Sequence, residues 1–152
     1  MRRSEREIKD RGHVEAVLER ATLLYLALAD GGKPYVVPMN FGYQDGCLFL
    51  HSAPEGRKIE ALRRNPAVCF AAVAEQEVVP SANACHWSVK YRSVIGWGRA
   101  SFVEEPGEKA RALDTIMRKF APGPFNYDRK ALARTCIIRI RIEKMTGKQA
   151  GY

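Results

Sequence analysis

Three strand-like runs follow one another between residues 22 and 52, and only turn residues separate them. An Asp-Gly-Gly turn closes the run at 22–30, the run at 34–43 follows at once, and an Asp-Gly turn leads into the run at 47–52. Such short turns between apolar runs are typical of β-hairpins, so the spacing predicts an antiparallel meander of three strands. It argues against a doubly wound α/β fold, which needs a helix after each strand.

Strands dominate the rest of the chain as well. Further strands are predicted at 67–74, 88–105 and about 134–144, and helices are predicted between residue 52 and Pro66 and over 106–121. Residues 75–87 are predicted to be a loop, and Gly96 and Gly98 indicate a bulge or a close backbone approach. Six strands with peripheral helices favour a mainly β fold, an antiparallel barrel, since closure removes exposed sheet edges. A length of 152 residues suits one domain over residues 1–152.

A formal net charge of +8 is compatible with nucleic acid, a membrane surface or an anionic small molecule as the partner. Five cations in residues 2–11 are interleaved with acidic residues, which is typical of a solvated helix face. Arg139 and Arg141 alternate with isoleucines in the last predicted strand, so we expect them to face water. No nucleic-acid recognition motif accompanies the charge, and we therefore expect no nucleic-acid partner.

The lengths of the apolar runs and the spacing of the cysteines indicate the localisation of the protein and whether it binds a metal. No apolar run approaches the ~20 residues of a membrane span, and the charged N-terminus does not resemble a secretory signal. We expect no membrane contact and a cytoplasmic location. The four cysteines are scattered and are predicted to be free thiols. Cys85-His86 has no second Cys/His cluster beside it, so no metal site is predicted.

The segment HSAPEGRK at residues 51–58 carries the strongest local signal for a ligand. Ser52 and Glu55 fit a capping box, which predicts that a helix begins immediately after the strand. Free backbone N–H groups and a partial positive charge gather at a helix start, and Arg57 and Lys58 add two full charges there. Cations at this end are unfavourable by about a few tenths of a kcal/mol each. A bound phosphate would compensate them; alternatively, both side chains simply extend into water.

The succession YVVPMNFGY, DGCLFLHSAPEGRKIEALRRNPAVCF and HWSVKYRSVIGWGRA resembles the nitroimidazole-resistance branch of the pyridoxamine 5'-phosphate oxidase-like, FMN-binding split-barrel superfamily. The resemblance implies a six-stranded antiparallel split β-barrel and a homodimer with FMN between two subunits. It assigns the FMN phosphate to Arg57 and Lys58, and the isoalloxazine and ribityl chain to the strand at 37–40. The residues that it assigns to the cofactor are Val37, Pro38, Met39, Asn40, His51, Ser52, Arg57, Lys58, Tyr91 and Ser93.

The same resemblance implies an FMN-dependent reductase or oxidase that uses a nicotinamide donor such as NAD(P)H. Reduction of a nitroimidazole to an amine is the activity that names the branch. The alternatives are a split barrel that binds haem or a deazaflavin, and a protein that binds its cofactor without turnover. His51 stands at the end of a predicted strand, where it can donate a proton to a substrate or merely pack in the pocket wall.

The size of the barrel predicts where a flavin can bind. Side chains fill the interior of a barrel this small, so FMN must lie outside it in a cleft. The apolar side chains around the strand at 88–105 exceed what a small barrel needs, and they are Trp87, Tyr91, Val94, Ile95 and Trp97. We therefore expect a C2 homodimer with two sites, each formed by residues 37–58 of one chain and 87–97 of the other. Trp87, Tyr91 and Trp97 form an aromatic wall or belong in part to the core.

Overall fold

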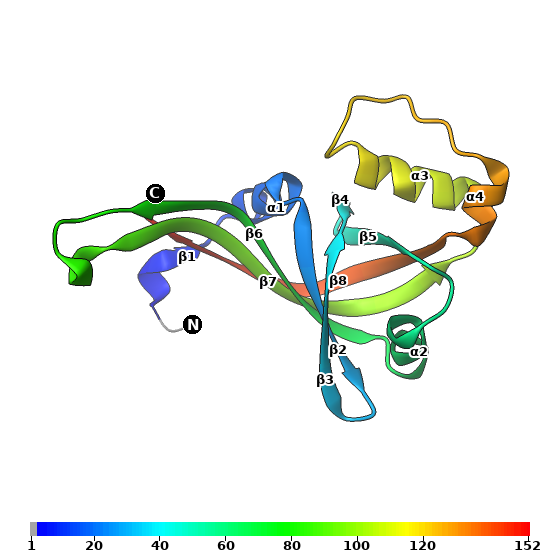
Figure 1. Cartoon of the computed structure of the whole chain (residues 1–152), viewed down its shortest axis with the longest axis horizontal. Coiled ribbons are helices and arrows are strands. Elements are labelled where there is room, and N and C mark those ends of the chain that lie inside the picture. Colours follow the sequence, from blue (N-terminus) through cyan, green and yellow to red (C-terminus); the bar gives the residue numbers. More distant parts are fainter. Residues whose placement is uncertain (1–2) are drawn as a thin grey trace.

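Eight β-strands form one antiparallel sheet in the computed structural model, which describes residues 3–152 (Figure 1). The strands are β1 (Glu7–Ile8), β2 (Leu23–Asp30), β3 (Lys33–Asn40), β4 (Gly42–Gln44), β5 (Cys47–Ser52), β6 (Ala67–Val79), β7 (Ser88–Val103) and β8 (Cys136–Ala150). The α-helices are α1 (Arg11–Arg20), α2 (Arg57–Arg64), α3 (Pro106–Met117) and α4 (Arg129–Arg134), and short 3-10 helices cover Ser4–Arg6 and Ala84–His86. The prediction of a mainly β fold with peripheral helices is confirmed.

The order of the strands shows how the sheet curls. Hydrogen-bonded neighbours follow the path β3-β2-β6-β7-β8-β5-β4, and β1 pairs with β8. Both predicted hairpin pairings form, since β2 pairs with β3 and β4 pairs with β5. The continuous three-stranded meander is wrong, because the run at 34–43 breaks at Phe41 into two strands at opposite ends of this path. Phe41 is fully buried. Since a single residue joins the two end strands, the path curls back on itself into a split barrel without a closed hydrogen-bonded ring.

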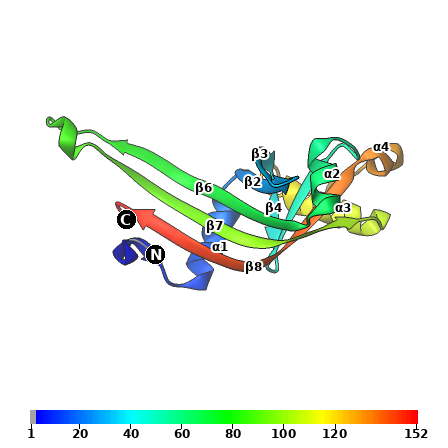
Figure 2. The same ribbon diagram turned by 90° about the horizontal axis from the view of Figure 1, so that it is seen from below.

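The hairpin of β6 and β7 continues beyond the barrel as a long arm, with β8 beside it (Figures 1 and 2). The predicted loop at 75–87 is wrong over its first five residues, where β6 continues to Val79 and pairs with the start of β7. This part of β6 begins with Glu-Gln-Glu and is largely exposed, so no apolar alternation reveals it as a strand. The tip of the arm is a short loop that contains the 3-10 helix Ala84–His86.

A helix covers one open face of the barrel near the N-terminus. Val14, Val17 and Leu18 lie on one side of α1 and are buried in the main core. The Asp10 side chain caps this helix by accepting a hydrogen bond from the backbone N–H of His13 at 2.8 Å. The charged segment 2–11 was predicted to be a helix face; instead it supplies the 3-10 helix and β1, and Arg2 lies outside the described residues.

Two glycines of β7 sit where other groups come very close, as the sequence predicts. A Cβ atom on Gly96 would lie 2.3 Å from the Phe70 ring, and one on Gly98 would lie 2.4 Å from the Arg141 carbonyl oxygen. The register between β7 and β8 shifts at Trp97 and Gly98, which is a bulge. The bulge bends the strands where the arm leaves the barrel.

The last two helices lie at one end of the sheet. The Glu105 side chain caps α3 by accepting hydrogen bonds from the N–H groups of Gly107 and Glu108 at 2.8 and 2.6 Å. The helix ends at Met117, four residues before the predicted end, and the short α4 was not predicted. Within residues 3–152, the structure contains no helix with the length and apolar character needed to cross a bilayer.

Candidate functional site

The start of α2 presents free hydrogen-bond donors. The capping-box prediction is wrong, because Ser52 ends β5 opposite Cys136 and the N-cap residue is Gly56. Gly56 has φ 110°, a conformation that is open to glycine, and no side chain among the described residues caps the helix. The first backbone bond of α2 runs from Glu60 N–H to the Gly56 carbonyl at 3.1 Å. The N–H groups before Glu60 therefore lack intrahelical acceptors, which is the arrangement that binds anions.

Arg57 is held beside this helix start by the β2–β3 hairpin. Its Nε–H donates to Oδ2 of Asp30 at 2.8 Å, and its guanidinium carbon lies 4.4 Å from the centroid of the Tyr35 ring. Arg64 donates to the other oxygen of Asp30 at 2.5 Å. The hydrogen bond from Arg57, followed by that from Arg64, lowers the pKa of Asp30. The Nη groups of Arg57 remain as donors for a ligand.

Lys58 has different surroundings from Arg57. Its side chain is half-buried, and burial lowers the pKa of its ammonium group, whereas the thiol of Cys136 opposes that shift. Arg57 thus contacts the β2–β3 hairpin, whereas the pKa of Lys58 responds to Cys136, the first residue of β8. The two side chains at the start of α2 therefore have different neighbours in the sheet. Neither Lys58 nor the Nη groups of Arg57 are paired with a carboxylate in the described structure.

Residues 37–40 lie on β3, which ends the sheet path, so one edge of its backbone has no strand partner among the described residues. Strand alternation directs Val37 and Met39 toward the core, where Met39 is 8% exposed. Pro38 and Asn40 are exposed on the other face, and the Asn40 amide donates to the Thr22 carbonyl at 3.1 Å. An edge position suits Pro38, which has no N–H to donate. The side chain of Met39 therefore belongs to the core, and this stretch can offer a ligand its backbone edge, Pro38 and Asn40.

His51 and Ser52 close β5 opposite Ile137 and Cys136 of β8. His51 is exposed and Ser52 is half-buried. Four residues separate Ser52 from the first residue of α2. Because neighbouring residues of a strand point to opposite faces, Ser52 shares a face with Cys136, whereas His51 lies on the other face, the one with Ile137.

Tyr91 and Ser93 lie on the arm, away from the other predicted site residues. Strand β7 passes α2 at Arg99, because Arg99 pairs with Ala67, which follows shortly after the end of that helix. Tyr91 is eight residues further along, a distance of roughly 26 Å at the rise of an extended strand. One chain does not bring Tyr91 and Ser93 to Arg57.

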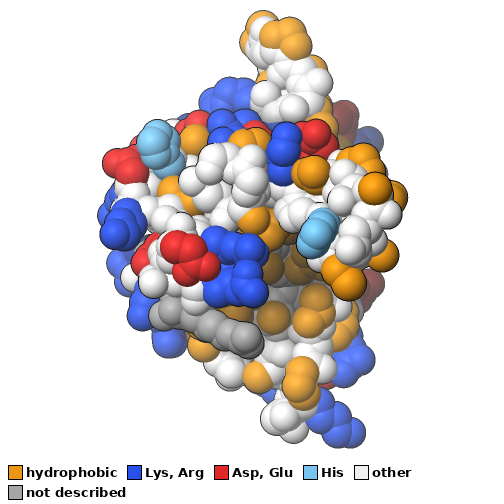
Figure 3. All heavy atoms as spheres, turned by 90° about the vertical axis from the view of Figure 1, so that its left-hand side faces the viewer, with side chains coloured by type: hydrophobic (Ala, Val, Ile, Leu, Met, Phe, Trp, Pro, Cys, Tyr) orange, Lys and Arg blue, Asp and Glu red, His pale blue; other side chains and the backbone are white. Residues whose placement is uncertain are grey.

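A contiguous apolar surface covers the outside of the sheet between the barrel and the arm. We call it the outer apolar face, and its large exposed members are Leu23, Tyr25, Val36, Val73, Ile95 and Trp97. Tyr25 is opposite Ala71, which is opposite Ile95, so three strands contribute to one row. Tyr25 is 48% exposed and Trp97 is 45% exposed. Figure 3 shows hydrophobic side chains in the floor of a hollow that Lys or Arg side chains border.

Two of the apolar residues that the sequence analysis placed in this surface lie elsewhere. Val94 is fully buried in the core, because its side chain points to the opposite face of β7 from Ile95. Trp87 is at the tip of the arm, where its Nε1–H donates to the Ser81 carbonyl at 2.6 Å. Trp97 is exposed on the outer apolar face, and Trp87 therefore forms no common wall with it in one chain.

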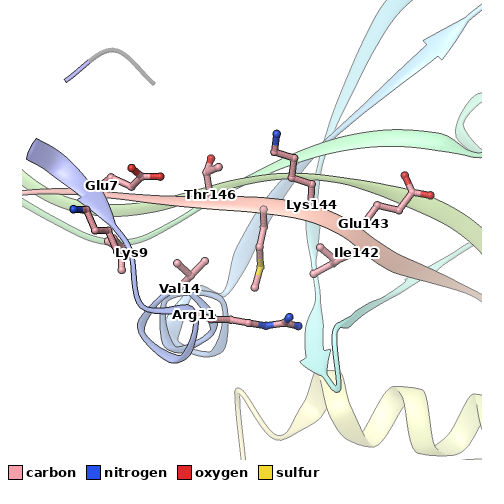
Figure 4. Close-up of a pocket in the computed structure, with 10 residues that line it drawn as sticks. Glu7, Lys9, Arg11, Val14, Ile142, Glu143, Lys144 and Thr146 are labelled. Atoms are coloured by element: carbon pink, nitrogen blue, oxygen red, sulfur yellow. The ribbon is translucent and has the colours of Figure 1, made fainter. Parts of the chain in front are cut away.

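A pocket of about 340 Å³ lies between β1, α1 and β8, apart from the start of α2. Figure 4 shows Val14 of α1 pointing toward β8 within it. Acidic and basic side chains both line this pocket, including Glu7, Lys9, Arg11 and Lys144. The mixture of charges does not favour an anion there.

Three residues that hold Arg57 in place were not predicted from the sequence, namely Asp30 at the end of β2, Tyr35 on β3 and Arg64 at the end of α2. Asp30 was interpreted as a turn residue that closes a hairpin, and it is 27 positions away from Arg57. No local pattern connects the two, since the contact arises only when α2 packs beside β2 and β3. The Asp-Gly-Gly turn was the one available signal, and it pointed to the hairpin alone.

The chain is similar to a known protein family and to solved structures. Residues 10–149 match the family model described as pyridoxamine 5'-phosphate oxidase. A crystal structure described as a "putative 5-nitroimidazole antibiotic resistance protein" from Bacteroides thetaiotaomicron is 37% identical, with a TM-score of 0.84, over 94% of this chain and 86% of that chain. No curated protein matches the chain significantly.

More distant structures share the fold. The flavocytochrome Anf3 from Azotobacter vinelandii is 22% identical over 100% of this chain and 72% of its own, with a TM-score of 0.85. The FAD and heme binding protein from Mycobacterium smegmatis is 23% identical over 97% of this chain and 74% of its own, with a TM-score of 0.84. At these identities the likeness concerns the fold alone.

Proposed function

Because the chain belongs to the pyridoxamine 5'-phosphate oxidase family, we propose that it binds FMN and acts as an FMN-dependent reductase or oxidase. The observation that carries the proposal is the uncapped start of α2, which presents Arg57 and Lys58 close to the edge strand β3. A flavin bound there supplies the electron transfer, and the protein supplies binding, orientation and electrostatics.

The phosphate of FMN fits the donors at the start of α2. Backbone N–H groups, the free Nη groups of Arg57 and the Lys58 ammonium are all suited to a dianionic phosphate. Asp30 holds the guanidinium of Arg57 from behind at 2.8 Å and therefore acts as a positioning residue. The compensating anion that these cations require is, on this proposal, the phosphate itself.

The ring and the ribityl chain are assigned to β3. Its unpaired edge can donate backbone N–H groups to the polar edge of the ring, and Pro38 and Asn40 face outward beside it. Ser52 at the end of β5 shares a face with Cys136, and His51 points to the opposite face of the strand. Exposed His51 is our candidate for giving a proton to a substrate.

A second copy of the chain would complete the site. Tyr91 and Ser93 are too far along β7 to reach the start of α2 in their own chain, and the outer apolar face is without a partner in a single chain. We therefore propose a C2 homodimer in which the arm of one chain contributes Tyr91 and Ser93 to the α2 site of the other. Burial of the outer apolar face supplies the driving force for this association.

The reaction proposed is the reduction of a small organic substrate with a nicotinamide donor, and a nitro group is the first substrate class to assay. Its support is the 37% identity to the protein described as a nitroimidazole resistance protein. Activity is measured as NADH- or NADPH-dependent loss of a nitroimidazole. Oxidation of the donor without loss of the nitro compound would assign the protein to another reaction.

Identification of the bound cofactor tests the proposal. The protein is purified without added flavin, its absorption spectrum is recorded, and the chromophore is extracted and identified by mass. FMN, or an apoprotein that takes up FMN stoichiometrically, supports the proposal. Haem or a deazaflavin as the extracted group would overturn it, and so would a protein that takes up no FMN.

A further inference from the structure

Three arginines lie side by side on the outside of β7 and β8. Arg99 is directly opposite Arg141, and Arg139 lies two residues along β8, opposite Ser101. All three side chains are exposed, which confirms that Arg139 and Arg141 face water as their alternation with isoleucines predicts. Within residues 3–152, none of the ion pairs involves any of the three.

Their arrangement is electrostatically unfavourable without a ligand. Residues directly opposite in an antiparallel pair have Cβ atoms about 5 Å apart, and like charges at such positions destabilise the sheet. Arg139 lies two residues before Arg141 on the same face of β8, at roughly 7 Å. The register of β7 and β8 fixes these spacings, so the backbone cannot move the three charges apart.

The cluster also has a pocket. It has a volume of about 470 Å³ and is lined by Cys47, Arg99, Ala100, Ser101, Arg139 and Arg141. At one end α3 covers the neighbouring sheet residues Phe49, Val103 and Ile137. At the other end Trp97 begins the outer apolar face. The pocket is therefore a basic recess between a covered and an uncovered part of the same sheet surface.

We propose that Arg99, Arg139 and Arg141 form a second anion site, which binds the pyrophosphate of a small organic molecule. Guanidinium forks bind phosphate oxygens in pairs, and three of them at these spacings suit two linked phosphates better than one. The Ser101 hydroxyl already donates to the Arg139 carbonyl at 3.4 Å, so the donors of the site are the three guanidinium groups. The site is distinct from the start of α2, since Arg57 contacts the β2–β3 hairpin instead. The inference does not rest on the proposed FMN function.

Pyrophosphate itself is the probe. Binding is measured by calorimetry at low ionic strength, with inorganic phosphate for comparison, on the wild type and on Arg139→Gln combined with Arg141→Gln. The control variant, Arg129→Gln combined with Arg134→Gln, removes the same charge from α4. We expect pyrophosphate to bind more tightly than phosphate, and the affinity to fall about tenfold or more in the cluster variant. The control should change it by less than about twofold.

Thermal unfolding gives an independent signature that also shows whether the variant folds. Without ligand and at low salt, Arg141→Gln should unfold at a higher temperature than the wild type, because a like-charge pair is removed. Added pyrophosphate should raise the unfolding temperature of the wild type and leave that of the cluster variant nearly unchanged.

Three results would overturn the inference. The first is a wild type that shows no binding of pyrophosphate, or a cluster variant that binds it with wild-type affinity. The second is loss of pyrophosphate binding in Arg57→Ala combined with Lys58→Ala, which would place the anion at α2. The third is a cluster variant whose sedimentation changes while pyrophosphate binding does not, which would assign the arginines to an interface between copies.

Discussion

The Nε–H of Arg57 donates to Oδ2 of Asp30 at 2.8 Å and thereby joins the start of α2 to the β2–β3 hairpin. Asp30→Asn keeps the size of the side chain but removes the charge that orients the guanidinium. We expect FMN to bind several-fold more weakly to this variant, with the fold retained, as measured by quenching of flavin fluorescence. Asp45→Asn in the exposed turn before β5 is the control. Unchanged or tighter binding in Asp30→Asn would show that the carboxylate does not position Arg57 for the phosphate.

The affinity for FMN should depend on pH through Lys58. Burial lowers the pKa of this ammonium group below its ordinary value of 10.5, whereas a bound phosphate favours the charged form. Binding should therefore be constant just above pH 7, where the phosphate is a dianion, and weaken as the pH rises through the lowered pKa. Lys58→Gln should bind more weakly and lack this decline. A decline of equal size in Lys58→Gln would assign the titration to another group.

Gly56→Ala tests whether the backbone at the start of α2 is part of the site. At φ 110° and ψ 170° an alanine is strained by about 1–3 kcal/mol, so both the free energy of unfolding and the affinity for FMN should fall. The matched control is Gly12→Ala in α1, where the nearest group to the new Cβ would be the flexible Asp10 carboxylate at 3.3 Å. Chemical denaturation and FMN titration measure the two effects. A Gly56→Ala protein with wild-type stability and affinity would contradict the role of this glycine.

The outer apolar face should control assembly. Ile95→Glu combined with Trp97→Glu places two charges on side chains that are each 45% exposed in the single chain, so the fold should survive. Sedimentation velocity should show a dimer for the wild type and a monomer for the variant, because charges at the centre of an apolar interface oppose association. Phe120→Glu, just after α3, is the control and should remain dimeric. A wild type that is monomeric with FMN bound would contradict the shared site.

Local patterns predicted much of the fold. The bounds of β5 agree with the predicted run at 47–52, because turn residues and a helix signal delimit it on both sides. The outer half of β6 was missed, since polar residues on an exposed arm carry no apolar period. The break at Phe41 was missed for a different reason. The run at 34–43 is split because the curled sheet places β3 at one end of the strand path and β4 at the other. This arrangement depends on tertiary contacts, which a local sequence pattern does not reveal.

The candidate site shows the same division between local and long-range information. Arg57 and Lys58 were found because a helix start and two cations are neighbours in the sequence. The helix start itself was misplaced, since the Ser52 and Glu55 signal competed with the backbone conformation of Gly56. Asp30 could not be found, because its contact with Arg57 depends on how α2 packs against β2 and β3. The assignment of Tyr91 and Ser93 to the cofactor stays a prediction that requires a second chain.

The central claim is that the start of α2 binds the phosphate of a flavin, and a paired titration tests it most directly. FMN and riboflavin are titrated into apoprotein, for the wild type and for Arg57→Ala combined with Lys58→Ala, with Lys130→Ala combined with Arg134→Ala on α4 as the control. We expect the wild type and the control to bind FMN far more tightly than riboflavin. The Arg57 and Lys58 variant should lose about 3 kcal/mol of FMN binding while its riboflavin affinity changes little. Equal affinities of the wild type for FMN and riboflavin, or a double variant that holds FMN as tightly as the wild type, would contradict the claim.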